Sequence, residues 1–143
     1  MAMRETRLDL GLLFLRLGGA GLLLAVHGLP KALHFRQQLG LIEDPLHLGA
    51  WPTLGFAVFA EVLCPLLIAL GWATRLACLP ILGLLLIALL VVHPQWSLEE
   101  GQFGWLLLVL FGTLALTGPG RYSLEARLAR RHAAQGGFAR ALS

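Results

Sequence analysis

The sequence has few charged residues and no long polar stretch. Of its 143 residues, 13% are charged and 57% are hydrophobic, and the mean hydropathy is +0.76. A soluble domain of this length cannot bury so much apolar surface. The scarcity of charge therefore excludes a soluble protein and indicates a membrane protein.

Cysteine is also scarce, and several motifs are absent. The only cysteines are Cys64 and Cys78, which form no C-x-x-C pair, so a disulfide-exchanging enzyme is excluded. At about 1.5 Å of rise per residue, their depths should differ by about 10 Å, and both should be small buried hydrophobic side chains. No haem-attachment, Walker A or G-x-G-x-x-G motif is present. The histidines lack tight ligand spacing, so no metal site is predicted.

The sequence does contain four long apolar runs. About 20 apolar residues of helix cross a hydrocarbon core of roughly 30 Å, and open strands cannot satisfy their backbone groups in lipid. We therefore predict an all-α, polytopic four-helix membrane bundle that forms a single domain. Its predicted spans are residues 8–27, 53–72, 76–93 and 103–117.

The connections between these spans differ in length. A long loop is expected over residues 28–52, a tight turn over 72–75 and a medium loop over 94–102. The first run is expected to be a retained span and not a signal peptide. Arg16 interrupts it, it is too long for a signal-peptide core, and no A-x-A-like site follows.

Basic residues fall mainly at one end of the predicted bundle. Eight arginines lie in the N-terminus, the 72–75 turn and the C-terminal tail, against Lys31 and Arg36 at the other end. This positive-inside bias predicts that both termini are cytoplasmic. The pI near 9.5 then reflects topology, and no nucleic-acid partner is expected. Residues 122–134 fit an amphipathic basic helix, with Ser123 as N-cap, on the anionic inner leaflet; a frayed basic tail is the alternative.

Two charges interrupt the apolar spans. Arg16 lies in the first span and Glu61 in the second, and each costs about 2.5–3.5 kcal/mol near the bilayer centre on insertion scales. Counted along the predicted spans at about 1.5 Å per residue, they fall within one helical turn of the same depth. We therefore predict that Arg16 and Glu61 pair inside the bundle. The pair would either serve a ligand directly or only fix how the helices pack.

Other polar side chains gather at the outer end of the predicted bundle. A stripe of Arg16, Gly19, Ala20, Leu23 and His27 follows one face of the first helix. Above it, the sequence predicts an outward-facing pocket lined by His27, Lys31, His93, Glu99 and Glu100.

These polar side chains also have structural explanations. The histidines can be interfacial residues with polar tips in the headgroup layer. The two glutamates can be acidic first-turn residues that follow Ser97 as an N-cap.

The chain resembles the DoxX family of small bacterial inner-membrane proteins. The resemblance runs from about residue 11 to residue 128 and rests on segments in a fixed order. They are "FLRLGGAGLLLAVHGLPKAL", "FAEVLCPLLIALGWATRLACL", a histidine ending the third span, "EE" opening the fourth, and "TGPGRYSLEARL". Pro30 and Glu125 depart from the usual family pattern.

The resemblance implies the bacterial inner membrane and a link to membrane redox complexes, since the family takes its name from similarity to a subunit of a thiosulfate:quinone oxidoreductase. The leading hypothesis is a subunit of a quinone-linked redox system that binds a quinone or a small sulfur anion. In it, Arg16 and Lys31 would attract negative charge, and Glu61 or His27 would handle protons, as the catalytic groups of an oxidoreductase subunit. The alternative is a non-enzymatic scaffold or binding protein for a metal-handling or redox partner. The sequence does not decide whether the protein is an enzyme, and it names no cofactor beyond the candidate quinone.

Overall fold

The computed structural model describes residues 2–141, and side chains are described for residues 5–133. Arg4 and Arg140, which were counted in the charge bias, lie outside the described side chains. Within the described part the chain is helical and contains no strand. Four helical segments are long and apolar enough to cross a membrane; they are Glu5–Leu33, Ala50–Leu70, Thr74–Val92 and Leu98–Thr117.

The first three spans each contain a π-helical turn. The first span joins α1 (Ala2–Leu23), η1 (Leu24–Gly28) and α2 (Leu29–Leu33). The second joins α4 (Ala50–Val58), η2 (Phe59–Leu63) and α5 (Cys64–Leu70), and the third joins α6 (Thr74–Ile87) and η3 (Ala88–Val92). The fourth is the single helix α7 (Leu98–Thr117), and α8 (Leu124–Ala141) follows it.

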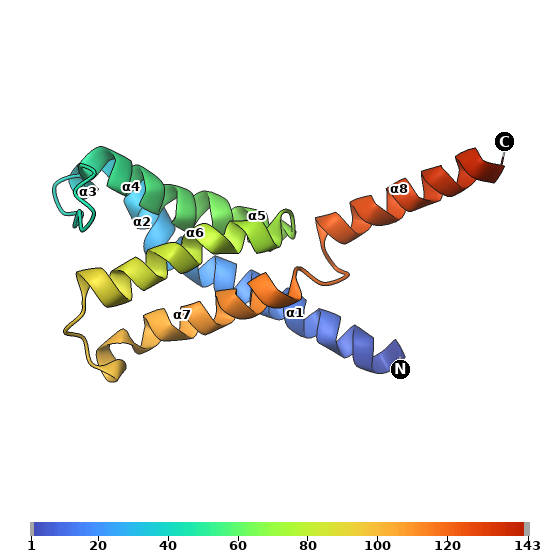
Figure 1. The fold of residues 1–143 in the computed structure, drawn as a ribbon, viewed down its shortest axis with the longest axis horizontal. Helices are drawn as coiled ribbons and strands as arrows, with labels where there is room; N and C mark the ends of the chain where they lie inside the picture. The colour runs from blue at the N-terminus through green and yellow to red at the C-terminus, as the bar shows by residue number, and fades with distance from the viewer. Residues whose placement is uncertain (1, 142–143) are drawn as a thin grey trace.

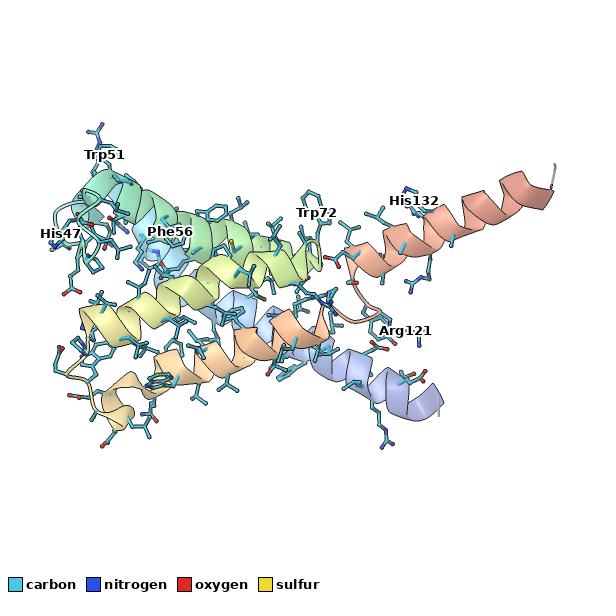
Figure 2. The ribbon with its side chains drawn as sticks, in the orientation of Figure 1. His47, Trp51, Phe56, Trp72, Arg121 and His132 are labelled. Atoms are coloured by element: carbon cyan, nitrogen blue, oxygen red, sulfur yellow. The ribbon has the colours of Figure 1, made fainter. Side chains whose placement is uncertain are left out.

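The four spans form an antiparallel bundle (Figure 1). In it, α6 packs between α5 and α7, and α1 packs against both α5 and α7. One end, called here the loop end, carries residues 34–49, including α3 (Phe35–Gln38), and residues 93–97. The opposite end, called the tail end, carries residues 71–73, residues 118–123, the start of α1 and the start of α8. Figure 2 shows His47 and Trp51 at the loop end and Trp72 and Arg121 at the tail end.

The four predicted spans are confirmed, but their limits move. The first helix continues to Leu33, so the predicted loop at 28–52 is wrong over its first residues. Pro30 does not end this helix. It has no N–H for an α-helical bond, and the wider turn η1 before it accommodates both this loss and the proline ring. The second and fourth spans begin at Ala50 and Leu98, earlier than predicted.

The tail half of the bundle has a closely packed hydrophobic core. Ile68, Ile81, Phe111 and Leu114 are each at most 1% exposed, and Cys64 and Cys78 lie fully buried in the same cluster. The prediction that both cysteines are buried small side chains is therefore confirmed. This core closes the bundle between the tail end and the loop half.

The helix α8 begins with the predicted cap and then leaves the bundle. The Ser123 hydroxyl accepts a hydrogen bond from the Ala126 N–H at 3.1 Å. The Glu125 N–H donates to the Gly71 carbonyl at 3.1 Å, which fixes the first turn of α8 to the tail end. Beyond that turn α8 extends away from the four spans (Figure 1). Its location on a lipid surface stays a prediction.

Candidate functional site

An ion pair lies in the loop half of the bundle, between the first and second spans. The Lys31 Nζ lies 2.7 Å from Glu61 Oε1 and 2.5 Å from Glu61 Oε2. The Glu61 side chain is 7% exposed and the Lys31 side chain 22%. The intramembrane carboxylate therefore has a counter-charge, but that charge is the lysine of α2.

The predicted pairing of Arg16 with Glu61 is wrong. Arg16 is 2% exposed and points to the tail end, where Nη1 donates to the Pro119 carbonyl and Nη2 to the Tyr122 carbonyl, each at 2.9 Å. The first span has 29 residues and is therefore about 43 Å long at about 1.5 Å per residue, more than the bilayer core needs. Ending the predicted span at His27, and not at Leu33, placed Arg16 too close to the loop end.

Three π-helical turns surround the ion pair, and each ends two residues before a proline. The turns η1, η2 and η3 precede Pro30, Pro65 and Pro94, respectively. In each turn an N–H bonds to the carbonyl five residues earlier, as from Cys64 to Phe59. A proline lacks the N–H of an α-helical bond and clashes with the preceding turn, and the wider turn relieves both problems. Pro80 lies inside α6 without such a turn, so a proline alone does not produce one.

The turns η1 and η2 touch, and a glycine makes the contact possible. Gly28 is buried against the backbone carbonyl of Glu61, and a Cβ at this position would overlap that oxygen. Pro65 has no N–H to bond this carbonyl along the helix. The close approach of the two backbones brings Lys31, less than one turn beyond Gly28, to the Glu61 carboxylate.

A cavity of about 330 Å³, called here the helix-side cavity, lies on one side of the ion pair. His27, Lys31, Glu61, His93 and Glu100 line it, five of the seven predicted site residues. The His27 ring is stacked on Phe103, with centroids 5.9 Å apart. Most of the remaining wall is apolar; it consists of Leu23, Ile81, Leu84, Leu85, Ala88, Leu89, Phe103 and Leu107, with Trp96 and Gly104.

A second cavity of about 400 Å³, called the loop-side cavity, lies under residues 38–53. Lys31, Glu61 and His93 line this cavity as well, so the ion pair forms part of the wall between the two spaces. Unlike the helix-side cavity, it adds polar groups from the loop end, namely Gln38, Glu43 and Thr53. Both volumes lie within the roughly 300–1,000 Å³ of small-molecule sites.

His93 belongs to both cavities and is held from two sides. Its ring stacks on Trp96, with centroids 3.8 Å apart and planes 4° apart. Its Nε2 lies 4.0 Å from the Glu43 carboxylate on the long loop. Sequence reasoning included His93 but missed Glu43, because nothing in the spacing of a long loop indicates which of its residues folds back over the bundle.

The two predicted glutamates of the fourth span separate in the structure. Glu100 forms a capping box with Ser97: its N–H donates to the Ser97 hydroxyl at 3.3 Å, and its carboxylate accepts from the Ser97 N–H at 2.7 Å. The predicted cap at Ser97 is confirmed, and Glu100 also lines the helix-side cavity. Glu99 is exposed and lines neither cavity.

The charged side chains that line the two cavities leave no excess of positive charge. Glu61 neutralises Lys31, Glu100 adds a negative charge, and Arg16 lies at the far end of the bundle. Among the residues whose placement is described, no three His, Cys, Asp or Glu side chains form a group that could hold a metal ion. The arrangement suits a neutral, largely apolar molecule with hydrogen-bond acceptors.

A comparison with known families supports the resemblance seen in the sequence. A family model described as DoxX matches residues 11–94, more than half of the chain. The matched range includes Lys31, Glu61 and His93, and it ends before the fourth span. No curated protein and no solved structure matches the chain.

Proposed function

Because this chain belongs to the DoxX family, and is a multi-pass membrane protein, we propose that it is the membrane subunit of a quinone-linked redox system. The quinone would bind in the helix-side cavity, and a partner subunit would deliver or remove the electrons. The protein would reside in the bacterial inner membrane with the loop end facing outward, as the charge bias predicts.

The observation that carries this proposal is a buried ion pair with unused hydrogen-bonding capacity in an apolar cavity. A lysine ammonium has three N–H donors, and Glu61 occupies two of the three at Lys31. The third can donate to a quinone carbonyl oxygen. The aromatic side chains of Phe103 and Trp96 provide flat apolar surface for the ring.

The same geometry favours a quinone over a small sulfur anion. An anion binds where positive charge is in excess. The Lys31 charge is already matched by Glu61, and Glu100 adds negative charge to the cavity. Arg16, which was expected to attract the anion, binds backbone carbonyls at the tail end instead.

The residues of the chain would have separate tasks. A bound quinone would supply the two-electron acceptor chemistry of the complex. Lys31 would orient one carbonyl oxygen, His27 would face the ring region from η1, and Glu61 would exchange protons. The apolar wall would keep bulk water from the ligand.

Lipid extraction and mass spectrometry of the protein, purified in nanodiscs with native lipids, test the proposal. We expect about one quinone per chain in the wild type. The double variant Lys31→Met/Glu61→Leu should fold and yet retain at least about tenfold less quinone, equivalent to about 1.4 kcal/mol of binding. The double change is used because Glu61→Leu alone would leave a buried lysine charge, which costs about 3 kcal/mol or more.

Glu99→Gln is the matched control, because Glu99 lines neither cavity; it should retain quinone at the wild-type level. A folded wild type without quinone would contradict the proposal. If that protein co-purified with a soluble partner, the non-enzymatic scaffold would be the better description.

A further inference from the structure

We propose that the loop-side cavity is a proton pathway, which connects Glu61 to the aqueous phase at the loop end through His93 and Glu43. This inference deepens the proposed function, because a quinone site must exchange protons with water. It also gives the two cavities different tasks. The helix-side cavity would hold the ligand, and the loop-side cavity would hold water.

The exposure of the three groups decreases stepwise into the bundle. The Glu43 side chain is 62% exposed and that of His93 is 28% exposed. The Glu61 side chain is 7% exposed. A proton from solvent can therefore reach Glu43 freely, His93 partly and Glu61 only through the protein.

The contacts along this route suit transfer through water. The 4.0 Å between His93 Nε2 and the Glu43 carboxylate is longer than a direct hydrogen bond, and a water molecule can bridge it. His93 and Glu61 line the same cavity of about 400 Å³, which has room for several waters. The hydroxyl of Thr53 and the amide of Gln38 in that wall supply further hydrogen-bonding partners.

Among the residues that the structure describes, the tail side of Glu61 is closely packed. Between Glu61 and the tail end lies the core that contains Ile68, Phe111 and Leu114, none of which is exposed. Arg16, at the far side of this core, holds backbone carbonyls and has no described carboxylate within ion-pairing distance. The loop end is therefore the side from which protons would arrive.

Several charged or titratable groups surround Glu61. Lys31 of α2 pairs with it, and His27 of η1 interacts with its charge. His93 at the end of η3 and Glu100 of α7 line the helix-side cavity with it, and Glu43 lines the loop-side cavity with it. Only protons move along the route, and no covalent bond to carbon or sulfur changes. When Glu61 takes a proton, it loses its charge and frees Lys31 to donate to the ligand.

Labelling with dicyclohexylcarbodiimide tests the pathway, since this lipophilic reagent reacts with protonated carboxyl groups in apolar surroundings. Quinone-free protein is placed in vesicles of known orientation, with one side at about pH 5 and the other at about pH 8, on either side of ordinary histidine titration. Mass spectrometry then measures the adduct on Glu61. We expect several-fold more adduct when the acidic side is the loop end.

In Glu43→Gln and in His93→Gln, the adduct on Glu61 should form more slowly after the loop-end side is made acidic. In the control Glu99→Gln it should form as fast as in the wild type. Labelling that follows the tail-end pH, or that is unchanged in both route variants, would overturn the inference. Because the protein contains no quinone in this experiment, its result is independent of the ligand test. Absence of quinone in the purified protein would contradict the proposed function but not the proton pathway.

Discussion

Arg16 is a buried guanidinium that binds backbone carbonyls instead of a carboxylate, while its Nε has no hydrogen-bond partner among the described residues. Its two terminal nitrogens donate to the carbonyls of Pro119 and Tyr122, just beyond the C-terminal end of α7. Gly71 packs directly against this guanidinium, where a Cβ would overlap Nη1. Arg16 therefore joins the first span to the connection between α7 and α8.

Removing this guanidinium should weaken the fold and leave the ligand site intact. Arg16→Met leaves the partly buried Pro119 and Tyr122 carbonyls without this donor, and an unsatisfied group costs about 1–3 kcal/mol where it is fully buried. Arg16→Lys keeps the charge but not the planar guanidinium fork. Its melting temperature should therefore lie between those of Arg16→Met and the wild type. Thermal unfolding and quinone content, measured on the same samples, check this. A lower melting temperature with unchanged quinone per folded chain is expected, and selective loss of quinone would place Arg16 in ligand binding after all.

Gly28 is the second residue on which the site depends. Gly28→Ala would force η1 away from the Glu61 carbonyl and so separate Lys31 from its partner. Overpacking of this kind costs about 1–3 kcal/mol, and quinone retention should fall with it. Gly21→Ala is the matched control in the same span, because a Cβ there meets nothing within 4 Å. If the two variants unfolded at the same temperature, the backbones would not be in contact as described.

At the scale of elements, the start of the second span is organised by one aspartate in the long loop. The Asp44 carboxylate accepts hydrogen bonds from the N–H groups of Leu48 and Gly49 and from the Thr53 hydroxyl, at 3.0, 2.7 and 2.8 Å. The bond from Gly49, followed by that from Thr53, lowers the pKa of Asp44 below its ordinary value near 3.8. The ionised carboxylate thus holds the loop over the loop-side cavity.

This arrangement predicts a definite pH dependence for the loop. Because the folded pKa of Asp44 is lowered, its contribution to loop order is complete above the ordinary carboxyl pKa and is lost as pH falls through the lowered value. The amide proton resonances of Leu48 and Gly49 should shift in that acidic range, as measured by NMR. In Asp44→Asn they should stay constant across it. A shift centred well above the ordinary pKa would contradict the assignment.

The apolar runs predict the membrane-spanning helices, but they do not predict the π-helical turns, which depend on packing between helices. Apolar runs of about 20 residues are sufficient to predict helices in lipid. They do not predict where a helix widens, and the same residue type gives a π turn before Pro65 but not before Pro80. The difference depends on neighbouring backbones, such as that of Gly28 against Glu61. For this reason, counting residues along a span does not give the correct depth of Arg16 or the correct partner of Glu61.

In the molecule as a whole, α1 and α8 both begin at the tail end of the bundle (Figure 1). The charge bias predicts that this end is cytoplasmic. Labelling of an introduced cysteine tests this orientation. Leu46→Cys places the cysteine at the loop end and His132→Cys places it in α8. Both positions are exposed, whereas the native cysteines are buried. An impermeant maleimide added to intact spheroplasts should label the first variant and not the second. If His132→Cys were labelled and Leu46→Cys were not, the loop end would be cytoplasmic, and protons would enter the proposed pathway from the cytoplasm.

The four membrane-spanning helices, the cap at Ser97 and the residue types of the site can be predicted from the amino-acid sequence, because hydropathy and capping act over a few neighbouring residues. The pairing of Glu61 with Lys31, the binding of Arg16 to carbonyls at the opposite end and the approach of Glu43 to His93 are seen only in the packed bundle. These contacts depend on the lengths, widened turns and mutual approach of separate helices. A linear count of residues along one helix does not contain that information.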